Sequence, residues 1–294
     1  MPSDRPRRSV LYVPAANPRA LAKASSLAAD VVILDLEDAV APEEKTAART
    51  RVAALLAEPG RPGGPERVVR INALASPYGH DDLAVMVPLA PDGLLVPKIA
   101  TRDDLAALRN AAAALAPGMS VPLWAMIETA RAVADPLTIA LDRAVTLPLA
   151  VLVLGLNDLA AETGTRQIAG RAPMLPWMMA VLAAGRAGGL DVIDGVFNDL
   201  DAGAAFEAEC RQAQDCGFDG KSLVHPSQIE PANRVFAPDE AELAVARRIA
   251  GLFEQPGHAG LGVVAFEGKM VERLHAEAAK RLIARAKSIA ARSD

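Results

Sequence analysis

The chain has 294 residues, a formal net charge of −5 at pH 7, and a composition that is 51% hydrophobic but only 3% aromatic. This composition predicts a large core of small aliphatic side chains, as in helices packed on a parallel sheet. The charge argues against a nucleic-acid-binding protein, which needs a basic face for the phosphates. No apolar run is long enough for a signal peptide or a membrane span. The spacing of Cys210 and Cys216 fits neither a redox pair nor a zinc site, so we expect reduced thiols in a cytoplasmic protein with no membrane partner.

An acidic stretch follows the second apolar run of the chain. In residues 31–42, four apolar residues lead directly into Asp35, Glu37 and Asp38. A run that is apolar on both faces predicts a strand covered on both sides, and charges at its carboxyl end lie where α/β folds place their chemistry. The simpler alternative is a polar loop and helix cap in front of Pro42.

Eight apolar stretches have the length of buried strands, and helix-like stretches alternate with them. The predicted strands are 9–13, 31–36, 67–71, 93–96, 122–127, 149–154, 191–196 and 220–223, and the predicted helices include 18–27, 43–56, 102–115, 176–187 and 202–216. Eight strands alternating with helices over about 230 residues match the size of a (β/α)₈ barrel. A doubly wound sheet is the competing architecture.

Charged or amide residues follow most of the predicted strands, which favours the barrel. They are Glu37, Asp38, Asn72, Lys98, Glu128, Asn157 and Asp158. In a barrel these strand ends converge on one mouth, whereas a doubly wound sheet would concentrate them at one switch point. We therefore predict an α/β fold, with a (β/α)₈ TIM barrel in residues 1–225. Two further helical stretches, 239–254 and 271–291, predict that residues 226–294 form a helical extension that packs on a neighbouring subunit.

The standard catalytic motifs are absent from the sequence, so the oxygen ligands become the main candidates. There is no GxSxG, HExxH or P-loop sequence, and the four histidines lack metal-ligand spacing. Glu128 and Asp158 follow two neighbouring predicted strands and would form a site for a hard divalent cation, most naturally Mg²⁺. Each residue alone is equally well explained as a charge or cap at a helix N-terminus.

Arg70 lies within an apolar predicted strand, where an arginine is rarely left unpaired. It either meets an internal carboxylate or binds an anionic substrate, because its guanidinium fits carboxylates in a bidentate geometry.

The strand-end motifs together resemble a known family, the citrate lyase β-subunit-like branch of the HpcH/HpaI aldolases. The matching segments are RSVLYVP (8–14), DLEDAV (35–40), RIN (70–72), PK (97–98), IET (127–129), GLNDL (155–159), GFDGK (217–221) and HPSQI (225–229). They occur in the right order along nearly the whole chain. The resemblance implies a (β/α)₈ barrel that cleaves or forms malyl-, citramalyl- or citryl-type thioesters with Mg²⁺, as a trimer or hexamer.

The resemblance also implies roles for individual residues. Glu128 and Asp158 would hold the metal, with Glu128 also close to the substrate. Arg70 would bind the substrate at the reacting carbonyl, and Glu37 and Asp38 would orient Arg70 or water at the metal. The residues implied to hold an acyl-CoA or acyl-carrier thioester are Arg19 and Lys23, with Lys221 as a further candidate; ordinary surface solvation is the alternative.

The implied proton donor is Glu272. The sequence GKMVER (268–273) places Glu272 where the family often has an aspartate, one methylene shorter. A charge favoured at a helix N-terminus is an equally good explanation for this residue.

Three other functions remain open at this point. The same fold would also suit a β-hydroxyacyl-CoA thioesterase or synthase, or a citrate lyase subunit that is inactive without its partners. A metal-free sugar-phosphate-binding barrel is less favoured, because the strand-end carboxylates would repel phosphate.

Overall fold

The computed structural model describes residues 5–118, 120–200, 203–258 and 260–293. These residues form two compact units, one containing Arg7–Phe236 and the other containing the described residues from Ala237 onward. Each unit is described separately below.

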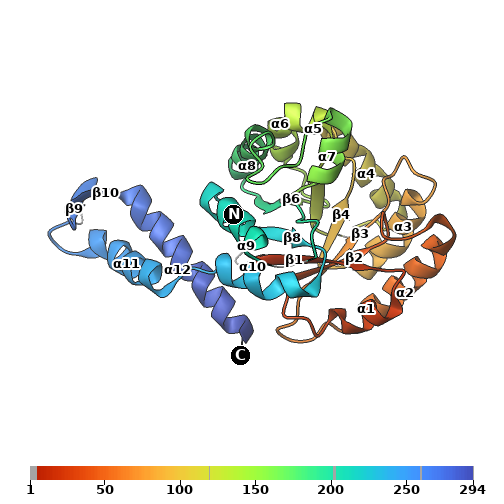
Figure 1. Ribbon diagram of the computed structural model, residues 1–294, viewed down its shortest axis with the longest axis horizontal. Helices are drawn as coiled ribbons and strands as arrows, with labels where there is room; N and C mark the ends of the chain where they lie inside the picture. Colours follow the sequence, from red (N-terminus) through yellow and green to blue (C-terminus); the bar gives the residue numbers. More distant parts are fainter. Residues whose placement is uncertain (1–4, 119, 201–202, 259, 294) are drawn as a thin grey trace. The chain divides into compact units, whose positions relative to one another are not determined.

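The first unit is built on a closed barrel of parallel strands (Figure 1). The strands are β1 (Ser9–Pro14), β2 (Val31–Asp35), β3 (Glu66–Arg70), β4 (Gly93–Val96), β5 (Leu123–Ile127), β6 (Leu149–Leu154), β7 (Asp191–Asp194) and β8 (Gly220–Leu223). Each strand pairs with the next along the chain, and β8 closes the barrel on β1, where Ser9 is opposite Lys221. The predicted (β/α)₈ barrel is therefore confirmed, because closure by parallel pairing leaves no sheet edge.

Alternate side chains of the strands fill the barrel interior, as the two-residue period of a strand requires. The interior cluster comprises Val10, Val31, Ile33, Val68, Leu95, Trp124, Met126, Val151, Val153 and Ile193. Two positions further along the strands, the same alternation places Asp35, Arg70 and Glu128 on the inward side. The polar residues of the mouth thus form the layer that follows the apolar interior cluster.

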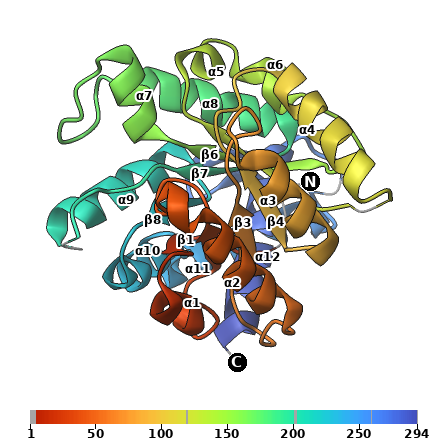
Figure 2. The same cartoon turned by 90° about the vertical axis from the view of Figure 1, so that its right-hand side faces the viewer.

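Helices surround the barrel on its outer side (Figure 2). They are α1 (Pro18–Ala24), α2 (Lys45–Ala57), α3 (Gly79–Met86), α4 (Arg102–Leu115), α5 (Ala130–Ala134), α6 (Pro136–Ala140), α7 (Leu156–Thr163), α8 (Leu175–Gly188), α9 (Ala204–Cys216) and α10 (Ile229–Val235). The helix predicted over 18–27 ends at Ala24. Five helices that the sequence analysis did not single out, α3, α5, α6, α7 and α10, have eight residues or fewer, too few to show a helical hydrophobic period.

A buried ionic cluster closes the barrel at the end opposite the mouth. The guanidinium of Arg7 donates two hydrogen bonds to Glu66, at 2.9 and 2.8 Å, and one to Asp191 at 2.5 Å. It also lies 4.9 Å from the ring centre of Trp124. Gly93 leaves room for this indole, because a Cβ at Gly93 would lie 2.7 Å from Nε1 of Trp124. All four charged and aromatic side chains of the cluster are buried.

The second unit consists of α11 (Glu240–Ala250), the antiparallel pair β9 (Val263–Phe266) and β10 (Lys269–Glu272), and α12 (Arg273–Ser293). Its sequence was predicted to be helical over 239–254 and 271–291. Residues 271 and 272 instead end β10, because the Gly-containing turn before them closes a hairpin, with Gly268 at a φ of 75°. Residues 226–236, which the sequence analysis grouped with the extension, fold with the barrel as α10 and its flanks. Among the described residues, no helix combines the length and apolar character needed to cross a bilayer.

Candidate active site

Glu128 and Asp158 come together at the carboxyl ends of the neighbouring strands β5 and β6. Glu128 directly follows β5, and Asp158 lies in the first turn of α7, shortly after β6. The side chain of Glu128 is only 1% exposed, whereas that of Asp158 is 39% exposed. The ammonium group of Lys98 contacts both carboxylates, with a hydrogen bond to Asp158 and a distance of 3.6 Å to Oε1 of Glu128. The two carboxylates therefore share the Lys98 ammonium group, with Glu128 buried and Asp158 facing solvent.

The backbone of Lys98 holds Glu128 in place. Lys98 follows β4 with a φ of 56°, a conformation that most side chains avoid, and its N–H donates a 2.7 Å hydrogen bond to Oε1 of Glu128. On the other side, Gly155 has no Cβ; one at that position would lie 2.7 Å from Oε2 of Glu128. One carboxylate oxygen is thus fixed by the backbone, and the other has room beside Gly155.

This arrangement fits a hard divalent cation. Within the described ranges, no three His, Cys, Asp or Glu side chains form a ligand group for a metal ion. Mg²⁺ is commonly bound through one or two carboxylates, with water and substrate oxygens as the remaining ligands. Glu128 and Asp158 supply such a pair, and the position of Lys98 shows that the pair attracts positive charge.

Arg70 meets the acidic loop that follows β2. Its Nε and Nη2 donate to the two oxygens of Asp35, both at 2.7 Å. Its Nη1 lies 2.8 Å from Oε2 of Glu37 and 3.3 Å from Asp38. The internal-carboxylate explanation for Arg70 is confirmed, and contact with a substrate stays a prediction. The ion pairs fix the guanidinium in one orientation, which is what an anion-binding group needs.

The acidic loop is itself held by two buried polar side chains. Nζ of Lys45, from the first turn of α2, donates to the carbonyl oxygens of Leu36 and Glu37, both at 2.8 Å, and to Asn72 at 2.7 Å. Asn72 donates in turn to the carbonyl oxygen of Leu36 at 2.9 Å. The role of Lys45 could not be predicted from the sequence, because a lysine near the start of a helix carries no signal of burial.

Burial and like charge raise the pKa of carboxyl groups at the mouth. Burial raises the pKa of Glu37 to about 8, with Asp38 and Glu128 adding to the increase and Arg70 opposing it. None of the described residues hydrogen-bonds Oε2 of Glu37, so its contact with Arg70 is ionic only. Burial also raises the pKa of Glu128, against the opposing effects of the Lys98 ammonium and N–H. A divalent cation beside these groups would favour their ionised forms.

We expect Mg²⁺ affinity to depend on the ionisation of Glu37. Because the pKa of Glu37 is about 8, raising the pH from about 7 to about 9 adds a negative charge near Glu128, so wild-type affinity should rise over this range. Glu37→Gln should reduce the rise and bind Mg²⁺ about 10–100-fold more weakly at the higher pH. Isothermal titration calorimetry at several pH values would measure the Mg²⁺ affinity of wild type and of Glu37→Gln. The control is Glu43→Gln, which makes the same change on an exposed residue. Equal affinities for Glu37→Gln and wild type would show that the loop is only a structural cap.

The basic residues predicted to hold the thioester differ in their surroundings. Arg19 and Lys23 are exposed on α1, whose first turn follows the carboxyl end of β1. Lys221 is fully buried, where it donates to Asp194 at 2.8 Å and Glu209 at 2.7 Å. A CoA contact through Lys221 is therefore wrong, because its ammonium is enclosed between β7, β8 and α9. Glu272 ends β10 in the second unit, and its catalytic role stays a prediction.

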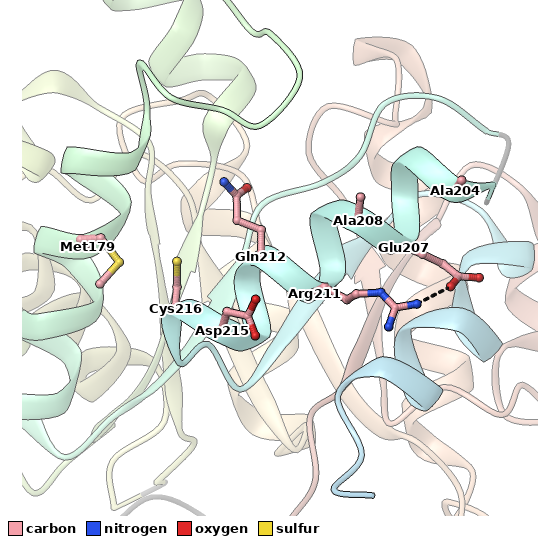
Figure 3. A pocket seen from close by; sticks show the side chains of 8 residues that line it. All are labelled: Met179, Ala204, Glu207, Ala208, Arg211, Gln212, Asp215 and Cys216. Carbon is pink, nitrogen blue, oxygen red and sulfur yellow. Dashed lines mark hydrogen bonds and ion pairs between the residues drawn. The ribbon is translucent and has the colours of Figure 1, made fainter.

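A surface groove lies apart from this cluster, along the outer helices. It has a volume of about 670 Å³ and is lined by α8 and α9 residues: Met179, Ala204, Glu207, Ala208, Arg211, Gln212, Asp215 and Cys216 (Figure 3). Arg211 and Glu207 form an ion pair of 3.2 Å within it. The described residues that line the groove include none of the strand-end carboxylates, so the candidate site is the barrel mouth.

Comparison with known proteins gives matches over most of the chain. The family model described as HpcH/HpaI aldolase/citrate lyase matches residues 8–226. The chain is 43% identical over 286 residues to a (3S)-malyl-CoA thioesterase of Cereibacter sphaeroides, covering 97% of this chain and 96% of that protein. It is 32% identical over 315 residues to an L-malyl-CoA/β-methylmalyl-CoA lyase of the same organism, covering 99% and 98%. Among solved structures, CitE of Mycobacterium tuberculosis in complex with magnesium, acetoacetate and coenzyme A superposes with a TM-score of 0.76 and 31% identity, covering 97% of this chain and all of that one.

Proposed function

Because the chain belongs to the HpcH/HpaI aldolase/citrate lyase family, we propose that it is a Mg²⁺-dependent enzyme that cleaves β-hydroxyacyl-CoA thioesters of the malyl-CoA type. The family resemblance predicted from the strand-end motifs is confirmed. The observation that carries the proposal is that Glu128 and Asp158 both contact the ammonium group of Lys98 at the barrel mouth, a pair of carboxylates of the kind that holds Mg²⁺. The similarity to CitE, which was solved with magnesium and coenzyme A, supports the same metal and substrate class here.

The favoured reaction is carbon–carbon cleavage. The β-hydroxyl of the substrate gives up its proton to a base at the mouth, for which the carboxylates there are the candidates. The bond between the hydroxyl-bearing carbon and the α-carbon of the thioester then breaks, and a ketoacid leaves. The electron pair of this bond passes to the thioester oxygen, which forms an enolate. When bound, Mg²⁺ supplies the Lewis acidity that lowers the pKa of the hydroxyl and orients the departing ketoacid.

Residues of this chain would perform the remaining tasks. Glu128 and Asp158 hold the metal, and Arg70, fixed by Asp35, supplies a preorganised positive charge for the thioester oxygen. Glu272 donates a proton to the enolate carbon, which yields the acyl-CoA product, and the base at the mouth releases the proton from the hydroxyl to solvent. Arg19 and Lys23 bind the phosphates of the CoA moiety. If Glu272 acts on a neighbouring subunit, the active form is the predicted trimer or hexamer, and light scattering would measure its mass.

Hydrolysis of the thioester is the second candidate function. The observation that favours it is the 43% identity to a (3S)-malyl-CoA thioesterase, which exceeds the 32% identity to the malyl-CoA lyase. In that reaction the thioester carbon–sulfur bond breaks, water supplies the hydroxyl, and free CoA thiol leaves. The same metal and the same charge on the thioester oxygen serve both reactions.

A product assay separates the two functions. Purified protein is incubated with malyl-CoA and citramalyl-CoA, with Mg²⁺ or with EDTA. We expect glyoxylate or pyruvate to appear with Mg²⁺ only, without free CoA thiol. Thiol release without a ketoacid would establish the thioesterase instead. No metal-dependent turnover of either ester would contradict the proposed function.

A further inference from the structure

Tyr12 occupies an inward position of β1, next to the candidate site. It continues the alternation from Val10 and packs against the interior cluster of the barrel while remaining partly exposed. The guanidinium of Arg70 lies 4.8 Å from the centre of its ring. Nothing in the sequence distinguishes Tyr12, because an aromatic residue in an apolar strand is usually a core residue.

The phenol group and Arg70 point toward the same atom. The hydroxyl of Tyr12 lies 4.0 Å from Sδ of Met126, and Nη1 of Arg70 lies 3.8 Å from the same sulfur. A thioether sulfur is a weak hydrogen-bond acceptor, so it satisfies the Tyr12 hydroxyl poorly. Nη1 of Arg70 meets this weak acceptor in addition to its contacts with Glu37 at 2.8 Å and Asp38 at 3.3 Å. Met126 is also one of the more adaptable side chains, with three rotatable bonds. The two donors therefore converge on a point that a better acceptor would occupy.

We propose that Tyr12 is a further catalytic residue, whose hydroxyl acts together with Nη1 of Arg70 as a hydrogen-bond donor to the thioester oxygen of the substrate. The inference rests on the proposed function, because it needs a thioester bound at the mouth. It applies to both candidate reactions, since the thioester oxygen gains negative charge in the enolate and in the tetrahedral intermediate of hydrolysis. Two preorganised donors aimed at one oxygen form the usual arrangement of an oxyanion hole.

The surroundings of Tyr12 keep its hydroxyl protonated. Burial raises the pKa of the phenol, Arg70 opposes the increase, and the charges of Asp35, Glu128 and Glu37 add to it. The hydroxyl is thus a donor throughout the physiological pH range. A purely structural role would need only the ring, which packs in the interior and under the guanidinium. Phenylalanine would preserve that packing and remove only the hydrogen bond.

Tyr12→Phe tests the inference. We expect kcat for the ester that wild type cleaves to fall about 10²-fold, as for the loss of one oxyanion donor, with KM changed no more than about threefold. Mg²⁺ affinity by calorimetry and the thermal midpoint should match wild type, which shows that the ring and the metal site are intact. The sequence has one other tyrosine, Tyr78, whose ring lies 5.5 Å from Nζ of Lys45. Tyr78→Phe makes the same chemical change as a control and should leave kcat unchanged.

The outcomes separate this inference from the proposed function. An active wild type with a Tyr12→Phe variant of equal kcat would overturn the catalytic role of Tyr12 and leave the proposed function standing. A loss of kcat that is matched by Tyr78→Phe, or accompanied by a lower thermal midpoint, would assign Tyr12 to packing. A wild type that turns over neither ester overturns both.

Discussion

Glu128→Gln is expected to lower Mg²⁺-dependent turnover by about 10³-fold, since a bound metal typically contributes several kcal/mol to a transition state and each 1.36 kcal/mol is a factor of ten. The amide keeps the size of the side chain, and its oxygen still accepts the hydrogen bond from Lys98 N–H that is now 2.7 Å long. It loses the negative charge, however, and with it most of the affinity for Mg²⁺. Calorimetric titration with Mg²⁺ would measure the affinity, and the malyl-CoA assay would measure the rate.

The control for this variant is Glu58→Gln, which makes the same change on an exposed residue after α2. It should retain wild-type affinity and rate. An unchanged thermal midpoint for Glu128→Gln would show that the fold is intact. If Glu128→Gln binds Mg²⁺ and turns over substrate like the control, Glu128 is not a metal ligand and the proposed site is wrong.

Arg7→Met is expected to lower the free energy of unfolding by about 3–5 kcal/mol, because it leaves Glu66 and Asp191 buried without their cation. The loss should depend on pH. Burial and the nearby Asp219 already raise the pKa of Asp191 to about 6, and removal of Arg7 would raise it further. As the pH falls, the Asp191 carboxyl group of the folded variant takes up a proton and its unpaired charge disappears. The difference from wild type should therefore be largest near pH 8 and shrink toward pH 5.

Urea unfolding at several pH values would measure this effect, with the fluorescence of Trp124 as a local probe of the cluster. Arg131→Met, on the exposed face of α5, removes the same charge at the surface and should change stability by no more than about 0.5 kcal/mol. A loss as small as that of the control, or one independent of pH, would mean that Arg7 contributes little to closing the barrel.

The strands could be predicted from the sequence almost residue by residue, and the reason is physical. A parallel barrel buries both faces of its strands, so most of them appear as apolar runs bounded by polar residues, whereas β8 has Lys221 and Ser222 in its middle. The short helices could not be predicted, since α5 and α6 have only five residues each and their positions depend on packing against the barrel. The hairpin in the second unit was missed because a strand ending and a helix beginning at adjacent residues leave no break in the sequence pattern.

The candidate site could be predicted only in part. The position of Glu128 and Asp158 after consecutive apolar runs was enough to predict that the two side chains lie close together. Lys98 was noted only as a strand-end residue, and nothing in the sequence indicates that its backbone adopts a φ of 56° and donates to Glu128. Lys221 was misinterpreted because sequence does not reveal burial, and a lysine enclosed by two carboxylates has the same local sequence as a solvated one.

The pairing of β1 with β8 affects how the chain acquires its site during synthesis. Tyr12 and Arg70 emerge early from the ribosome, but β1 lacks its second neighbour until residue 223 has been made. Contacts between segments so far apart in sequence form late and slowly, and the unpaired edge of β1 stays open to wrong partners in the meantime. The barrel mouth is therefore one of the last regions to reach its folded structure. A nascent chain that stalls before β8 would be prone to aggregation, with Glu128 and Asp158 already made but not yet enclosed in a closed barrel.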